Sequence, residues 1–120
     1  RNSSRSPCGL NGISSGLLTC PTCESSFHTY SVVVDRRKTD DGNIRWYLDG
    51  RPYLRVDEKG NKIGRSIWNA AIDHGFAIIF DLAIGGVWPN SDCGCTTSTA
   101  KTTSPGTLSI RYVAVYVQRA

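Results

Sequence analysis

The chain has 120 residues, of which 39% are hydrophobic and 20% are charged, so it suffices for one small globular domain and excludes two. Its formal charge of +4 comes from 14 Lys and Arg against 10 Asp and Glu. The basic run 36–38 is flanked by aspartates, which predicts a solvated hairpin tip and no nucleic-acid surface. The longest apolar stretch, 76–84, is too short to cross a bilayer, so we expect a soluble chain that does not bind membranes.

Five cysteines and the lack of methionine are typical of an exported protein with disulfides: Cys8, Cys20, Cys23, Cys93 and Cys95. A zinc site built from Cys20/Cys23 and Cys93/Cys95 is the alternative. We favour disulfides, because the second pair lacks the usual spacer of about two to four residues. An odd count leaves one thiol without a partner inside the chain. The cysteines predict a secreted protein, and because no apolar leader follows a basic start, we expect any signal peptide to have been removed already.

The first part of the chain, 1–26, is rich in Cys, Ser and Gly and has little periodicity. Residues 28–35 are rich in β-branched and aromatic residues, which predicts a strand. Residues 43–48 and 51–56 alternate between polar and apolar side chains, and the dipeptide between them is Asp-Gly. This pattern predicts a β-hairpin with a two-residue turn.

The second half of the chain predicts one short helix and further strands. We expect the helix near 65–71, with Ser66 as a candidate N-cap. The apolar run 76–84 predicts a strand buried on both faces, and the alternation over 107–117 predicts a long closing strand after a polar loop at 90–106. Short strands, Gly/Pro punctuation and little helix indicate an all-β fold, either a sandwich or a jelly roll.

Four sequence motifs follow one another along the chain: Phe27-His28-Thr29-Tyr30, 44–50 (IRWYLDG), 74–89 (HGFAIIFDLAIGGVWP) and 112–116 (YVAVY). Together they resemble the C-terminal half of a glycoside hydrolase family sixteen domain, that of the laminarinase-like β-1,3-glucanases. The Pro7-Cys8 segment and the pair Cys20/Cys23 are similar to the actinomycete-type members. The resemblance covers about residues 7–119. It implies that 27–120 form the C-terminal part of a concanavalin A-like jelly roll, and that the partner is a β-glucan polysaccharide.

The resemblance also implies two substrate-binding residues. The position of Asp81 is usually Asn in the family and faces the sugar, and Trp88 matches a cleft tryptophan that stacks on a glucosyl ring. The alternatives are that Asp81 faces water or a partner, because an unpaired buried carboxylate is costly, and that Trp88 covers the sandwich edge. We expect structural roles, with His28 bonded to backbone, for the other tryptophans and the histidines: Trp46, Trp68, His28 and His74.

The catalytic motif of the family is missing from the chain. Retaining glycosidases need two carboxylates, which the family places on one strand as Glu-x-Asp-x-Glu or Glu-x-Asp-x-x-Glu. The chain has only Glu24 and Glu58, in separate predicted loops. We therefore expect the motif to lie upstream, so that this chain supplies cleft wall, carries no catalytic residue and is inactive alone. A non-catalytic β-glucan-binding or lectin-like module, or a structural strand-exchanged dimer, are the alternatives.

Metals, disulfides and partners complete the expectations drawn from the resemblance. Arg111 stands where the family commonly has an Asp that helps bind a structural calcium, and a guanidinium cannot ligate a cation, so we expect neither calcium nor another cofactor. We expect Cys20 to pair with Cys23, and Cys8 to pair outside the chain. Half a jelly roll leaves unpaired strand edges and an uncovered apolar face, so we expect the N-terminal half or a second copy to cover it.

Overall fold

A computed structural model describes residues 13–16, 18–37, 41–82, 85–87, 90, 94, 100, 102 and 106–118. The chain divides into two compact units, Arg1–Gly75 and Phe76–Ala120, and each is described by itself. Among the described residues, no helix reaches the length and apolar character that a membrane span requires.

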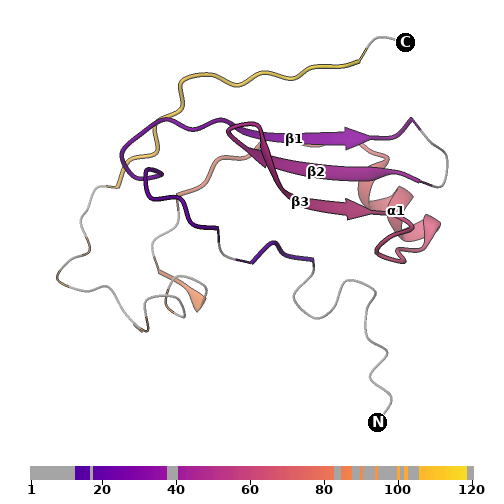
Figure 1. Ribbon diagram of the computed structural model, residues 1–120, viewed down its shortest axis with the longest axis horizontal. Coiled ribbons are helices and arrows are strands. Elements are labelled where there is room, and N and C mark those ends of the chain that lie inside the picture. The colour runs from indigo at the N-terminus through magenta and orange to yellow at the C-terminus, as the bar shows by residue number, and fades with distance from the viewer. Residues whose placement is uncertain are drawn as a thin grey trace. The chain divides into compact units, whose positions relative to one another are not determined.

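The first unit contains an antiparallel sheet of three strands in the order β1 (Tyr30–Asp35), β2 (Asn43–Leu48) and β3 (Arg51–Asp57) (Figure 1). Asp49 and Gly50 connect β2 to β3, and both have positive φ angles, of 50° and 77°. Positive φ at both central residues is the geometry of the tight turn that matches strand twist. The predicted hairpin is therefore confirmed, and the sheet agrees with the expected all-β class.

The predicted helix is confirmed as α1 (Arg65–Ile72), but the predicted cap is wrong. The N-cap is Gly64, whose backbone is extended and whose position has no side-chain capping bond. Because the helix begins directly after Gly64, Ser66 is already its second residue and lies past the capping position.

The core of the first unit lies between α1 and one face of the sheet. Ile44 and Val56 are opposite each other in the β2–β3 register, and both are buried. Trp68 of α1 is only 3% exposed and belongs to the same cluster. Five partly buried side chains pack against these three: Ile13, Trp46, Leu54, Ile63 and Ile72. The packing roles predicted for Trp46 and Trp68 are thus confirmed.

A glycine and a buried carboxylate join this core to the start of the sheet. Gly42 is buried beside the indole of Trp68, and a β-carbon at residue 42 would lie 2.7 Å from the indole nitrogen. The Gly42 carbonyl accepts a 3.0 Å bond from the backbone N–H of Glu58. The Glu58 carboxylate is buried and accepts a 2.9 Å bond from Arg65 at the start of α1. Backbone and ion pair therefore hold the sheet and the helix in one arrangement.

The second unit does not show the strands expected at 76–84 and 107–117. Its described stretches 76–82 and 106–118, here called the apolar segments, contain no helix or strand. Their large apolar side chains are exposed, to 83% for Ile79 and 76% for Val115. Strand structure requires a hydrogen-bonded neighbour, and β1–β3 pair only with one another in the part of the chain that is described. The expected second layer of a sandwich is likewise not among the described residues.

Candidate functional site

The two residues predicted to bind glycan are not brought together by the described structure. Asp81 lies exposed in the first apolar segment, which is not a buried strand as expected. Trp88 lies outside the described residues, as do Cys8, Cys93 and Cys95. Val87, the neighbour of Trp88, is 88% exposed. The cleft roles of Asp81 and Trp88 therefore stay predictions.

A small cavity opens in the first unit between the end of β1 and helix α1. Its volume is about 40 Å³, and its lining residues are Arg36, Gly42, Arg65, Trp68 and Asp73. The Arg36 guanidinium donates to the carbonyl of Ile72 and lies 3.5 Å from the Asp73 carboxylate. Ligand pockets commonly measure about 300–1,000 Å³ and one water needs about 10–15 Å³, so this cavity has room for a few waters and none for a glucosyl ring.

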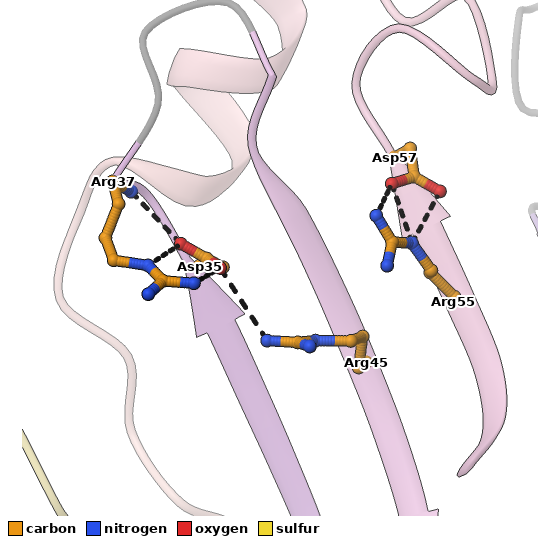
Figure 2. Close-up of polar contacts among 5 residues, drawn as sticks. All are labelled: Asp35, Arg37, Arg45, Arg55 and Asp57. Atoms are coloured by element: carbon orange, nitrogen blue, oxygen red, sulfur yellow. Dashed lines mark hydrogen bonds and ion pairs between the residues drawn. The ribbon is translucent and has the colours of Figure 1, made fainter. Parts of the chain in front are cut away.

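Side-chain alternation along the strands places Arg45 and Arg55 on the sheet face opposite to that of Ile44 and Val56. Figure 2 shows the ion pairs of these two arginines. Asp35 at the end of β1 accepts two side-chain bonds from Arg37, at 2.9 and 2.6 Å, and lies 3.7 Å from Arg45 of β2. On β3, Arg55 donates to Asp57 at 2.6 and 2.8 Å. Arg45 and Arg55 are cross-strand neighbours, so the aspartates offset a repulsion between two like charges.

These pairs do not suit acid catalysis. The hydrogen bonds from Arg37 hold the pKa of Asp35 well below its usual range, and Arg45 adds to the effect. A general acid for glycosidic cleavage needs a carboxyl group whose pKa is raised, so that it still carries a proton near neutral pH. The two glutamates offer no better pair, because Glu58 is buried against Arg65 while Glu24 lies exposed in the turn after Cys23. Asp35, Asp57 and Glu58 are thus each held by an arginine partner.

A second polar cluster surrounds His28, immediately before β1. The His28 Nδ1–H donates to Asp49 Oδ2 at 2.7 Å, and Nε2 lies 3.1 Å from the hydroxyl of Thr22. Asp49 also accepts a 2.9 Å bond from the backbone N–H of Thr29. We expected His28 to bond to backbone; its partners here are side chains, because the hairpin turn brings Asp49 beside the start of β1.

The electrostatics of this cluster favour a charged pair. The hydrogen bond to Asp49 raises the pKa of His28, and a contribution from Thr22 acts in the same direction. The same bond to His28 lowers the pKa of Asp49. The sequence predicted Asp49 only as a turn residue. The feature that could have indicated the pair is an acidic residue in a turn together with a histidine just before the neighbouring strand.

The cysteines of this region lie in the turn that carries Thr22. Cys20 and Cys23 form a disulfide, and the Cys23 backbone N–H donates to the Cys20 carbonyl at 3.2 Å. Cys23 Sγ also lies 3.2 Å from the hydroxyl of Tyr30. A ring nitrogen of His28 and the two sulfur atoms lie within 4.8 Å of one another. The side chains of Cys20, Cys23 and His28 therefore lie together, and we call them the sulfur and imidazole group.

Comparison with known proteins finds two curated relatives. The chain is 32% identical over 100 residues to Glucan endo-1,3-beta-glucosidase A1 of Niallia circulans, a match that covers 82% of this chain and 13% of the relative. It is 29% identical over 90 residues to the Clotting factor G alpha subunit of Tachypleus tridentatus, which covers 75% of this chain and 11% of that protein. No protein-family model and no solved structure matches the chain. The chain is therefore similar, over most of its own length, to about an eighth of each of these two larger proteins.

Proposed function

We propose that the chain is part of a secreted β-1,3-glucan-recognising domain of the glycoside hydrolase family sixteen type. In this proposal it supplies one wall of a glycan cleft, and the catalytic carboxylates come from outside the chain. The observation that carries the proposal is the 32% identity, over 100 residues, to a protein named as a glucan endo-1,3-beta-glucosidase. The four motifs that resemble the family occur in order in the same small chain and support it.

The absence of catalysis from the chain alone follows from its carboxylates. A retaining glycosidase holds its two carboxyl groups about 5–5.5 Å apart across the scissile bond. The sequence has no Glu-x-Asp-x-Glu strand, and its Glu58 is 3% exposed and bonded to Arg65. A substrate would have to break that buried ion pair to use Glu58. We therefore assign binding, and no bond cleavage, to these 120 residues.

A non-catalytic β-glucan-binding module is the second candidate. The observation that favours it is the other relative, which is named as a clotting factor subunit and not as a glucosidase. The DNA immediately before the codon for Arg1 separates the two candidates. The enzyme hypothesis predicts that it encodes a Glu-x-Asp-x-Glu or Glu-x-Asp-x-x-Glu strand, and a substituted motif there would favour the binding module.

Site variants test the cleft wall. We expect Trp88→Ala to weaken laminarin binding about tenfold or more, which corresponds to about 1.4 kcal/mol, because stacking on a sugar ring is lost. Val87→Ala is the matched control, since Val87 is the exposed neighbour and should not matter. Asp81→Asn should keep affinity and Asp81→Ala should lose it, since an amide can still bond to a sugar hydroxyl. Equal losses from Trp88→Ala and Val87→Ala would contradict the stacking role.

A reducing-sugar assay on laminarin tests the assignment of chemistry. The chain alone should release no reducing ends above the buffer control. If the chain does release reducing ends, Glu24→Gln and Glu58→Gln locate the group responsible. Activity retained in both variants would show that other groups cleave the glucan, and activity lost in either variant would place a catalytic carboxylate inside the chain. Either result would contradict the proposal.

A further inference from the structure

The sulfur and imidazole group around His28 contains the donor types of a zinc site. Cys20 Sγ, Cys23 Sγ and a His28 ring nitrogen lie within 4.8 Å of one another. Thiolates and imidazole are ligands that zinc takes in proteins, including sites with three protein ligands and a water, and two cysteines separated by two residues are a usual zinc spacing. The sequence alone suggested Cys93 and Cys95 as the other half of such a site, whereas the fold places His28 there.

The three residues lie close enough to share one tetrahedral ion once the disulfide between Cys20 and Cys23 is opened. Bonds of about 2.3 Å to sulfur and about 2.0–2.1 Å to nitrogen set neighbouring donor atoms roughly 3.5–3.8 Å apart. The three donors already lie within 4.8 Å, and the two cysteine Cα atoms are 5.4 Å apart. Once the disulfide is opened, rotation of the two cysteine side chains is enough to bring three donors around one ion.

The hydrogen bonds of His28 present the correct nitrogen. Nδ1–H donates to Asp49 at 2.7 Å, and Asp49 is itself held by the backbone N–H of Thr29 at 2.9 Å. In the neutral imidazole this bond keeps the proton on Nδ1, so Nε2 carries the lone pair that a metal ion needs. Nε2 lies 3.1 Å from the hydroxyl of Thr22, one of the two residues between the cysteines and the one next to Cys23. A carboxylate that orients a histidine in this way is the usual second partner of a zinc-bound imidazole.

We propose that Cys20, Cys23 and His28 Nε2 form a redox-controlled zinc site, with water as the fourth ligand. In the oxidised form the disulfide closes the site. A dithiol reductant transfers two electrons and two protons to the disulfide, giving two thiols while the reductant becomes a disulfide. Zinc binding then releases the two thiol protons to solvent. This inference does not depend on glucan recognition.

The test uses the full 120-residue chain with its three other cysteines replaced: Cys8→Ser, Cys93→Ser and Cys95→Ser. After reduction with dithiothreitol and its removal under argon, the protein is titrated with Co²⁺ as the spectroscopic probe for zinc. We expect one equivalent of Co²⁺ to bind with thiolate-to-cobalt charge-transfer bands and tetrahedral d–d bands, and Zn²⁺ to bleach both. The oxidised protein should show neither band.

Single substitutions in this background locate the ligands. His28→Gln should weaken Co²⁺ binding at least tenfold, and Asp49→Asn should weaken it about 10–100-fold because the imidazole loses its orientation. His74→Gln is the matched control and should bind as the parent does, since His74 lies outside the cluster and bonds to the carbonyl of Gly75. Circular dichroism of each variant establishes that its secondary structure is retained.

Three results would overturn the proposal: the lack of a charge-transfer band in the reduced protein, equal Co²⁺ binding by the oxidised protein, or equal affinity of the His28→Gln and His74→Gln variants. If His28→Gln fails to fold, Cys20→Ser takes its place. Retention of the parent spectrum by Cys20→Ser would then reject the site. A laminarin titration of the same proteins keeps this outcome distinct from a failure of the proposed function.

Discussion

Replacing Gly42 by alanine tests how the first unit is held together. The added β-carbon would lie 2.7 Å from Nε1 of Trp68 and 2.9 Å from two further indole carbons. The indole has little room to move away from the added β-carbon, because Trp68 is 3% exposed and packed in the core. Residue 42 is also held in place, since its carbonyl accepts a 3.0 Å bond from Glu58. Both contacting groups are therefore fixed, and the clash must be relieved by strain.

The magnitude follows from two opposing effects. Overpacking of a filled core costs about 1–3 kcal/mol. A Gly→Ala change also stabilises by about 0.4–1 kcal/mol through the unfolded chain, and the φ of Gly42 lies outside the left-handed region, so no backbone strain is added. We expect Gly42→Ala to lower the free energy of unfolding by about 1–2 kcal/mol. Gly75→Ala is the control, because a β-carbon there meets nothing within 4 Å, and it should be neutral or stabilising.

Urea unfolding followed by tryptophan fluorescence and circular dichroism measures both variants. A double-mutant cycle sharpens the result: in a Trp68→Leu background the indole is gone, so Gly42→Ala should lose most of its cost. Equal stability of Gly42→Ala and the parent chain would contradict the clash. An unchanged loss of stability in the Trp68→Leu background would also contradict it, because the indole would then not be the cause.

Three further predictions concern charge and exposure. Arg65→Met should lower the free energy of unfolding by about 1–3 kcal/mol, because it leaves the buried Glu58 carboxylate without its 2.9 Å partner. Lys59→Met, at an exposed residue, is the control and should have little effect. Equal urea midpoints of the two variants would contradict the role of the ion pair. The raised pKa of His28 makes its pairing with Asp49 fully stabilising below pH 6.5, and this stability is lost as pH rises through the raised value. The lowered pKa of Asp49 makes the pairing stabilising above pH 3.8, and this stability is lost as pH falls through the lowered value. Asp49→Asn should therefore make Tm less dependent on pH on both the acidic and the basic side. An unchanged Tm–pH profile would contradict the pairing. Because the apolar segments are exposed, we expect the chain to self-associate, and light scattering should give a mass above 13.1 kDa. A stable monomer of 13.1 kDa would contradict the expectation that another chain covers these segments.

Local patterns allowed the first unit to be predicted. The Asp-Gly dipeptide at 49–50 and the alternation on either side predict the hairpin, because turn type and pleat are decided by neighbouring residues. The same holds for α1, although its start was misplaced: a serine near a helix start predicts a cap only when the backbone is extended there, and the extended residue is Gly64. The burial of Trp68 follows from its apolar bulk and its place on the helix.

Features that depend on distant residues were not predicted. The apolar runs at 76–84 and 107–117 indicate β-propensity, but a strand also needs a partner, and no described segment pairs with either stretch. The bond between His28 and Asp49 joins residues 21 positions apart and depends on strand register. The glycan-binding roles of Asp81 and Trp88 rest on the resemblance alone. Both residues belong to the second unit, so the packing and electrostatics of the first unit do not test these roles.

Isothermal titration of the chain with laminarin tests the central claim, β-1,3-glucan recognition, most directly. Dextran, an α-linked glucan, is the matched control. We expect laminarin to give saturable heat and dextran to give none, and we expect Trp88→Ala to lower the affinity for laminarin about tenfold. Equal heats with both polysaccharides, or no heat with laminarin from a chain whose hairpin and helix are folded by circular dichroism, would contradict it.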